Sequence, residues 1–269
     1  MVSGGLRGVT ADCLVALTQH IPLKLALLGR SAFSEEALET RGLTSDAALQ
    51  QWLLQQAKAK GESLTPTQLR SQLAAIHANR EMARNRHRLE QTGATVRYFR
   101  CDISDRAAVE HALTTIRAEW GAIRGIVHGA GVLADKLIQA KSDAQFHQVF
   151  NTKVEGFRTL LRLTCDDPLT LICCFSSVAA RTGNRGQSDY AMANEVLNKV
   201  CQFERDRRLA AAQPCLVKSI NWGPWAGGWS RPNLKPTLPP RGWSYWRSMP
   251  VSRPLWLSCT RVSRAVSRW

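Results

Sequence analysis

The segment that decides the fold is the opening stretch "SGGLRGVTADCLVALTQHIPLKLALLGRS" (residues 3–31). A glycine-rich turn leads into an apolar run at helical spacing and then into a short apolar strand that ends in Gly-Arg-Ser. Such a turn before a helix directs backbone N–H groups and the positive end of the helix dipole toward a phosphate. A plain loop would explain the glycines about equally well, so the interpretation depends on the rest of the chain.

Beyond this segment, apolar strands alternate with helices. We expect strands ending near residues 102, 132, 177 and 225, with helices at 106–121, at 143–164 and around Tyr190. The strands are continuous apolar runs, typical of strands that are buried on both faces. The pattern predicts an α/β fold with a doubly wound parallel sheet and helices on both faces.

Two departures from a regular sheet are expected. Residues 35–91 are polar and helical, which predicts a helical insert after the second strand, and "TPTQ" (residues 65–68) combines an N-cap, a proline at N1 and a glutamine at N3. Only Val2 corresponds to a first strand. Because that strand lies at the centre of a doubly wound sheet, the expected result is a gap in mid-sheet.

Composition limits the class of protein. The 269 residues are 44% hydrophobic, which suits a globular protein, and no apolar run reaches the roughly 18 residues that would span a bilayer. The start has no basic-then-apolar leader. The eight cysteines form no CxxC pair, so buried reduced thiols in a cytoplasmic protein are expected, with no metal site.

The net charge of +15 is unevenly distributed. Residues 229–269 hold eight Lys and Arg, no Asp or Glu, five of the nine tryptophans and six of the eleven prolines, without a helical or strand period. Codons can be chosen for this tail such that a shift of reading frame near codon 228 gives an acidic, helix-like sequence that begins with methionine. We therefore interpret 229–269 as a non-native or disordered tail. The alternative is a genuine basic tail that binds RNA or a membrane.

Several strand ends suit a dinucleotide. A basic group at the end of the second strand favours a 2′-phosphate, and so NADPH, although a solvated arginine is the alternative. The end of the third strand would flank an adenine, and small residues after the fourth would let a cofactor lie against the backbone. The candidate cofactor-binding residues are Ser3, Gly4, Gly5, Gly8, Arg30, Ser31, Asp102, Ile103, Gly129, Ala130 and Gly131.

The stretch "FSSVAARTGNRGQSDYAMAN" (residues 175–194) places Ser177 at a strand end, thirteen residues before Tyr190. It resembles the ketoreductase domain of modular polyketide and fatty acid synthases, within the short-chain dehydrogenase/reductase superfamily. In that subgroup an asparagine occupies the position four after the tyrosine, here Asn194. The lysine lies on the preceding helix in a K-x-x-G context, which "NTKVEG" matches at Lys153.

The resemblance implies a Rossmann-like fold and a role for each of these four residues. Hydride transfer to a ketone builds negative charge on its oxygen, which needs a proton donor and hydrogen bonds. Tyr190 is expected to be the general acid and Ser177 a donor to the carbonyl oxygen. Lys153 is expected to lower the pKa of Tyr190 and to bind the nicotinamide ribose, and Asn194 to complete a proton relay, so Lys153 and Tyr190 also count as cofactor-binding residues.

Further motifs resemble the ketoreductase of polyunsaturated fatty acid synthases over residues 2–228. "INWGPWAGG" (residues 220–228) matches the strand and loop that close over the nicotinamide, and Asp135 in "GVLADK" matches a stereochemical Leu-x-Asp position, which implies a D-3-hydroxyacyl product. Thr10 replaces the third glycine of the cofactor loop.

The expected function is NADPH-dependent reduction of a 3-ketoacyl thioester on acyl carrier protein, within a multidomain synthase. The alternative is a catalytically inactive remnant or structural fragment of such a synthase. A nucleic-acid-binding protein is a third hypothesis, which rests on the basic tail alone. The basic run "HANREMARNRHR" (residues 77–88) could help to dock the acidic carrier, although a solvated helix face or a contact with a neighbouring domain is favoured.

Overall fold

The computed structural model describes residues 1–225. Residues Met1–Gly223 form one compact unit, and a second unit begins at Pro224. The expected non-native tail at 229–269 lies outside the described residues.

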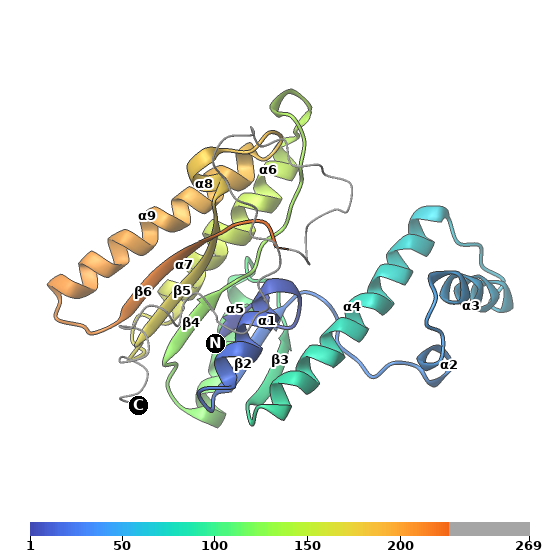
Figure 1. Ribbon diagram of the computed structural model, residues 1–269, viewed down its shortest axis with the longest axis horizontal. Helices are drawn as coiled ribbons and strands as arrows, with labels where there is room; N and C mark the ends of the chain where they lie inside the picture. The colour runs from blue at the N-terminus through green and yellow to red at the C-terminus, as the bar shows by residue number, and fades with distance from the viewer. Residues whose placement is uncertain (226–269) are drawn as a thin grey trace. The chain divides into compact units, whose positions relative to one another are not determined.

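The compact unit is built on one parallel sheet in the order β3-β2-β1-β4-β5-β6 (Figure 1). Its strands are β1 (Val2–Ser3), β2 (Lys24–Gly29), β3 (Thr95–Arg100), β4 (Gly125–His128), β5 (Leu171–Ser177) and β6 (Leu216–Trp222). All five neighbouring pairs are parallel, which confirms the predicted doubly wound sheet. The strand order reverses between β1 and β4, and this is where such folds bind dinucleotides.

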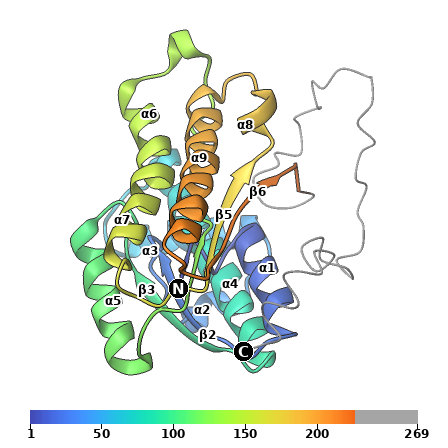
Figure 2. The same ribbon diagram turned by 90° about the vertical axis from the view of Figure 1, so that its left-hand side faces the viewer.

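Helices cover both faces of the sheet (Figure 2). The pleat of β2 directs Leu25 and Leu27 into a core with α1 (Gly8–Thr18) and α4 (Pro66–Gln91). Ala26 and Leu28 of the same strand face the opposite core. That core includes α5 (Arg106–Trp120), α7 (Gly156–Leu163) and α9 (Ser188–Ala210).

The centre of the sheet is filled only toward the carboxyl ends of the strands. Val2 and Ser3 pair with Leu27 and Leu28 of β2 on one side and with Val127 and His128 of β4 on the other. A first strand therefore exists and pairs on both sides, so the expected gap in mid-sheet is wrong. The strand is only two residues long, in agreement with the expectation that it is largely missing. Those two residues lie at the edge where the candidate site residues gather.

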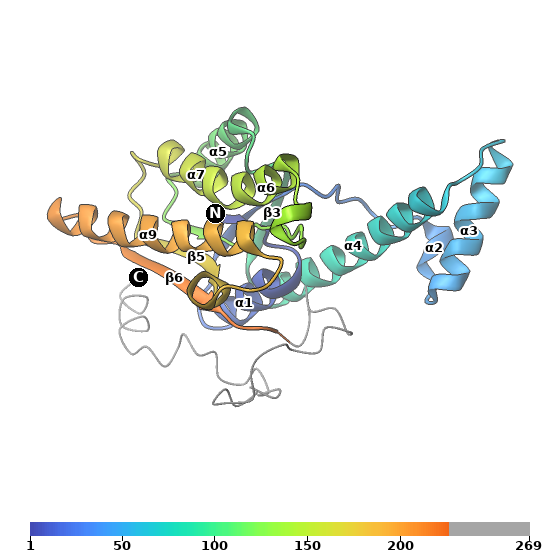
Figure 3. The same cartoon turned by 90° about the horizontal axis from the view of Figure 1, so that it is seen from above.

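The insert predicted at residues 35–91 forms α2 (Leu38–Arg41), α3 (Asp46–Ala59) and α4 (Figure 3). The predicted capping box at Thr65 and Gln68 is present, with Pro66 in the first turn. Leu49 and Leu53 of α3 and Leu73 of α4 make a small core of their own. This part of the insert is thus held by its own apolar contacts, while the C-terminal half of α4 packs on the sheet.

The helix expected at residues 143–164 is interrupted. It comprises α6 (Asp143–Phe150), a π-helical turn (Asn151–Glu155) and α7, and the π turn contains Lys153. Short π segments inside α-helices occur often at functional sites. Two brief elements complete the fold, namely a 3₁₀ turn (Ile138–Ala140) and α8 (Ala179–Thr182).

None of the helices within residues 1–225 is long and apolar enough to cross a membrane. The seven cysteines in this part of the chain are free thiols, and none of its His, Cys, Asp and Glu side chains gather in a group that could hold a metal ion.

Candidate active site

The glycine-rich turn lies where β1 and β4 diverge. Gly4 and Gly8 adopt φ of 76° and 56°, a left-handed conformation that favours glycine. The Gly4 N–H donates to the Leu28 carbonyl at 2.8 Å, and a Cβ on Gly4 would lie 3.0 Å from the Ala130 nitrogen. Gly5 is buried against Leu27, where a Cβ would lie 2.7 Å from a methyl group. The sequence predicted that these small residues form one backbone cradle, and they lie together.

A buried histidine connects this turn to Lys153. The Lys153 carbonyl can only accept, so His128 Nε2 carries the proton and donates to it at 2.9 Å. His128 Nδ1 then accepts from the Ser3 hydroxyl at 2.8 Å, and Ser3 Oγ accepts from the Ala130 N–H. Burial, followed by the charge on Lys153, lowers the pKa of His128 to about 3, which keeps the ring neutral. Sequence reasoning missed this role because Ser3 and Lys153 are remote from His128 in the chain.

Lys153 projects from the π turn into the interior. Its side chain is buried, Nζ donates to the Phe175 carbonyl at 2.9 Å, and Nζ lies 5.5 Å from the centroid of the Tyr190 ring. Burial lowers the pKa of Lys153 to about 8. The glycine of the K-x-x-G motif has a steric reason, since a Cβ on Gly156 would lie 2.8 Å from Cγ2 of Ile103.

Ser177, Tyr190 and Asn194 meet at the carboxyl end of β5 and the start of α9. Burial raises the pKa of Tyr190, while hydrogen bonding with Ser177 and Asn194 lowers it and the charge of Asp135 raises it, and the net pKa is above its ordinary value. The groups that shift this pKa are thus Ser177, Asn194 and Asp135, while the Lys153 ammonium lies over the ring and donates to the Phe175 carbonyl.

Asn194 is fully buried, and only one of the two polar atoms of its side chain is hydrogen-bonded within the described residues. Its Nδ2 donates to the Tyr190 carbonyl at 2.8 Å, whereas its Oδ1 has no hydrogen-bond partner among residues 1–225. Leaving a buried amide oxygen unpaired costs about 1–3 kcal/mol, so such atoms usually serve a ligand or a water. Together with the glycine cradle at the strand-order reversal, this orphaned acceptor makes the site a fit for a dinucleotide.

The ends of β2 and β3 lie beside this cradle. Arg30 is exposed, and Ser31 accepts from the Tyr98 hydroxyl through its carbonyl at 2.8 Å. Burial raises the pKa of Asp102. Hydrogen bonds from Ser104 and the charge of Arg30 together lower it by more, so the net pKa is below the ordinary value. The Ile103 side chain is buried in the core and Asp102 is only partly buried, so Asp102 is the more accessible of the two residues predicted to flank an adenine.

The loop after β4 forms another side of the site. Gly131 follows the cradle, and Asp135 is exposed and accepts from Gln187 Nε2 at 3.1 Å. Within the first compact unit, the "INWGPWAGG" motif comprises the end of β6 and Gly223, and its last three residues lie outside the described part of the chain.

Glu81 of α4 reaches the glycine turn, a contact that the sequence did not suggest. Its Oε1 accepts from the Gly8 N–H at 2.8 Å, and its Oε2 pairs with Arg7 Nε at 2.9 Å. Gly8 starts α1, so a carboxylate from the insert already binds at the positive end of that helix dipole.

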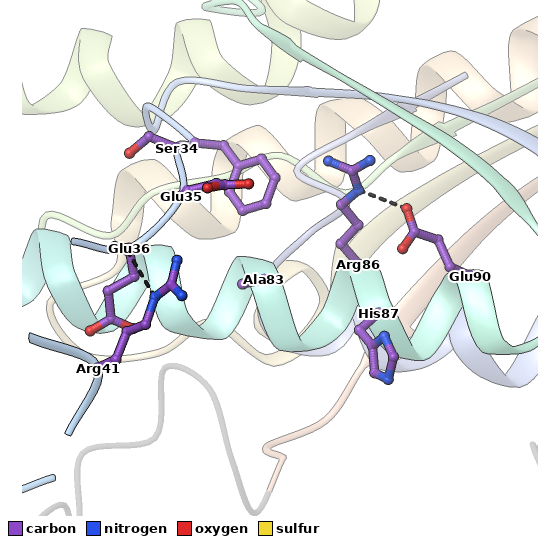
Figure 4. Close-up of a pocket in the computed structure, with 9 residues that line it drawn as sticks. Ser34, Glu35, Glu36, Arg41, Ala83, Arg86, His87 and Glu90 are labelled. Carbon is purple, nitrogen blue, oxygen red and sulfur yellow. Dashed lines mark hydrogen bonds and ion pairs between the residues drawn. The ribbon is translucent and has the colours of Figure 1, made fainter. Parts of the chain in front are cut away.

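The basic run at residues 77–88 is largely paired within the protein. Arg80 binds Glu36, Arg86 binds Glu90 and Arg88 binds Asp12. Arg86 also lines a cavity of about 460 Å³ between α4 and the segment after β2, as Figure 4 shows. Its lining residues are Phe33, Ser34, Glu35, Glu36, Arg41, Ala83, Arg86, His87 and Glu90, so it is separate from the Tyr190 site. Because these arginines are paired within the protein, their contacts favour a solvated helix face or a domain contact over docking of the acidic carrier.

Comparison with known proteins agrees with this geometry. A family model described as "KR domain" matches residues 1–227. The chain is 37% identical over 243 residues to a polyunsaturated fatty acid synthase subunit of Thraustochytrium sp., covering 87% of the chain but 8% of that protein. It is 38% identical over 141 residues to polyketide synthase PksL of Bacillus subtilis, covering 51% of the chain and 3% of PksL. The chain thus spans a small part of these relatives.

Solved structures show the same fold. A ketoreductase domain from the bacillaene assembly line superposes with a TM-score of 0.65 at 24% identity, over 87% of this chain and 46% of that one. An N-terminal ketoreductase from the macrolactin assembly line gives a TM-score of 0.62 at 27% identity, over 84% and 36% of the two chains. Because the family model spans all of the described residues, the chain belongs to the KR domain family of polyketide and polyunsaturated fatty acid synthases, and by this resemblance it is an oxidoreductase of the ketoreductase type.

Proposed function

We propose that this chain uses NADPH to reduce a 3-ketoacyl thioester, carried on acyl carrier protein, to the 3-hydroxyacyl thioester. The observation that supports this most is the convergence of Ser177, Tyr190, Asn194 and Lys153 at the carboxyl edge of the sheet, beside the glycine cradle. Carbonyl reduction is the reaction class that needs a phenol, a hydroxyl and a buried ammonium next to a dinucleotide fold.

NADPH would supply the hydride, and the protein would supply the proton and the hydrogen bonds. Tyr190 would donate its phenolic proton to the substrate oxygen as negative charge develops there. Burial raises the pKa of Tyr190, so the phenol holds its proton at neutral pH, and a nearby positive charge would be needed to make it a better donor. Ser177, which hydrogen-bonds Tyr190, would donate to the same oxygen and stabilise the developing charge.

Lys153 and Asn194 would act on the far side of the phenol. A pKa of about 8 leaves Lys153 charged at neutral pH, so its ammonium can hold the nicotinamide ribose and oppose negative charge on Tyr190. The unpaired Oδ1 of Asn194 would accept from a water that returns a proton to the phenol. If Lys153 Nζ exchanged its hydrogen bond to the Phe175 carbonyl for one to the ribose, the ammonium would come nearer to the Tyr190 phenol.

The cofactor would lie across the strand-order reversal. The turn of Ser3, Gly4, Gly5 and Gly8 would hold the pyrophosphate, and Gly129, Ala130 and Gly131 would leave room for it. Arg30, with Ser31 beside it, would bind the 2′-phosphate, and Asp102 would bind the adenine. Asp135 would select the D-3-hydroxyacyl product from the substrate side.

The chain would work as one domain of a larger cytoplasmic synthase, since it spans 8% of a relative that is named as part of a polyunsaturated fatty acid synthase. The acidic carrier protein and the neighbouring synthase domains would be its partners.

The test is consumption of NADPH on addition of a 3-ketoacyl thioester, presented on acyl carrier protein and on a short pantetheine mimic. We expect turnover with both and a lower KM for the carrier-bound form. NADPH binding without any turnover would refute the reductase and favour the inactive remnant.

A further inference from the structure

Lys141 and Asp189 form a buried ion pair beside Tyr190. Lys141 Nζ lies 2.7 Å from Asp189 Oδ2, and the two side chains are 5% and 1% exposed. Most ion pairs among residues 1–225 have at least one partner that is far more exposed. Glu204 and Arg208, at the other end of α9, form the other pair in which both side chains are under 10% exposed.

The pair connects Lys141 to the loop after β4 and to the first turn of α9. Lys141 also donates to the Ala134 carbonyl at 2.7 Å, next to Asp135. The second oxygen of Asp189 accepts from the Tyr190 N–H at 2.8 Å. A backbone bond from Lys136 to the Gly186 carbonyl closes the same connection at 3.0 Å. The loop after β4 is thereby tied to the turn of α9 that carries the candidate acid.

The start of α9 depends on this carboxylate. The N-cap residue Gln187 makes no side-chain capping bond, and Asp189 is the acidic residue of the first turn. Asp189 therefore occupies the place where a negative side chain satisfies N–H groups and the helix dipole. Lys141 holds that carboxylate in one orientation, since its Nζ is fixed at the same time by Ala134.

The free-energy cost of burying two charges indicates that the Lys141–Asp189 pair has a role beyond stability. Removing two charges from water is expensive, and well-packed apolar residues at such positions often serve stability as well or better. A buried pair that is kept in spite of this cost can act by fixing one geometry. Here the geometry is the position of the Tyr190 backbone relative to β5, which carries Ser177.

We propose that Lys141 and Asp189 are positioning residues, which fix the first turn of α9 so that Tyr190 points at the reacting oxygen. This inference rests on the proposed reductase function for its kinetic consequence, but the placement of Tyr190 can be measured without activity.

The experiment compares Lys141→Met, Asp189→Asn and the double variant with the full chain. Glu204→Gln is the matched control, since it breaks the other buried pair of the same helix far from Tyr190. Each variant is examined for kcat, for NADPH affinity, for the free energy of unfolding and by NMR with tyrosine labelled at ¹³Cζ. The chain has only three tyrosines, so the Tyr190 signal is identified by its loss in Tyr190→Phe.

Each single variant should lower kcat by about 10- to 100-fold, as a misplacement of about 1 Å does, with NADPH affinity unchanged within about twofold. Its Tyr190 signal should shift or split. The double variant leaves no unpaired buried charge but still lacks the pair, so it should recover stability while kcat stays low and the Tyr190 signal stays shifted or split; recovery of kcat in the double variant would overturn the proposal. Glu204→Gln should lower stability but change neither kcat nor the Tyr190 signal.

The proposal is overturned if the single variants, like Glu204→Gln, lose only stability while the Tyr190 signal stays unchanged. If the unmodified chain binds NADPH but reduces nothing, the proposed function fails, and the NMR comparison still decides whether the pair positions Tyr190.

Discussion

Removing the buried charge of Lys153 should make the protein more stable and less active. The pKa of Lys153 is about 8 in the folded chain against 10.5 for a free lysine. At about 1.4 kcal/mol per pKa unit, burial disfavours the ammonium by about 3 kcal/mol. The hydrogen bond to the Phe175 carbonyl, worth about 1 kcal/mol, is lost in Lys153→Met. The variant should therefore gain about 2 kcal/mol in the free energy of unfolding at neutral pH.

The free energy of unfolding should also depend on pH differently in the unmodified chain and in Lys153→Met. A lysine whose folded pKa is depressed destabilises the fold fully below that pKa, and the penalty is relieved as pH rises from about 8 toward 10.5. Between about pH 6.5 and pH 9 the unmodified chain should gain about 1.4 kcal/mol that Lys153→Met does not gain. The buried amino terminus is common to both proteins and cancels in this difference. Lys153 also lowers the pKa of Cys174 and of His128, but burial holds the Cys174 pKa well above this pH range and the His128 pKa, at about 3, well below it.

Urea unfolding at the two pH values, followed by circular dichroism, measures the effect. Lys199→Met is the control, because Lys199 is 65% exposed and its removal should change stability by less than about 0.5 kcal/mol at either pH. Reduction by Lys153→Met should fall by at least about 100-fold. Equal pH dependence of stability in the unmodified chain and in Lys153→Met would refute the reasoning that the ammonium is buried and charged.

Three further predictions concern the cofactor and the oxyanion. Glu81→Gln keeps an acceptor for the Gly8 N–H but removes a negative charge from the start of α1, so the KM for NADPH should fall by about two- to fivefold, whereas a rise would show that the charge assists binding. Arg30→Ser should raise the KM for NADPH by about tenfold and leave that for NADH nearly unchanged, and equal effects on both would exclude a contact with the 2′-phosphate. Ser177→Ala should lower kcat by about 100-fold with NADPH affinity retained, and an unaltered kcat would remove Ser177 from the oxyanion site.

Most of the fold follows from local patterns. Continuous apolar strands alternating with helices predicted the parallel sheet, and the Thr65 and Gln68 capping box predicted where α4 begins. A first strand reduced to Val2 was expected to leave a gap in mid-sheet, and no local pattern indicated that Val2 and Ser3 pair on both sides and close it. The π turn at Lys153 was not predictable, because its pattern of polar and apolar residues is that of an ordinary helix.

The candidate site was predictable where a motif is local. The spacing of Ser177, Tyr190 and Asn194 is short, and Lys153 was found through its family context. Contacts made by tertiary folding were missed, namely His128 between Ser3 and Lys153, Glu81 on Gly8, and Lys141 with Asp189. In each of these contacts the partners are tens of residues apart, and nothing in either local stretch indicates the other. The packing of Ile103 into the core was not predictable, because a strand end does not reveal which way its side chain packs.

The most direct test of the account is transfer of deuterium from NADPH labelled at the nicotinamide C4 to C3 of a 3-ketoacyl thioester. The unmodified chain should yield the 3-hydroxyacyl thioester with deuterium at C3. Tyr190→Phe should bind NADPH normally and form this product at least about 100-fold more slowly, because it has no phenolic proton to donate. Labelled product formed at the same rate by Tyr190→Phe would contradict the assignment of Tyr190 as the acid, and no labelled product from either protein would contradict the reductase itself.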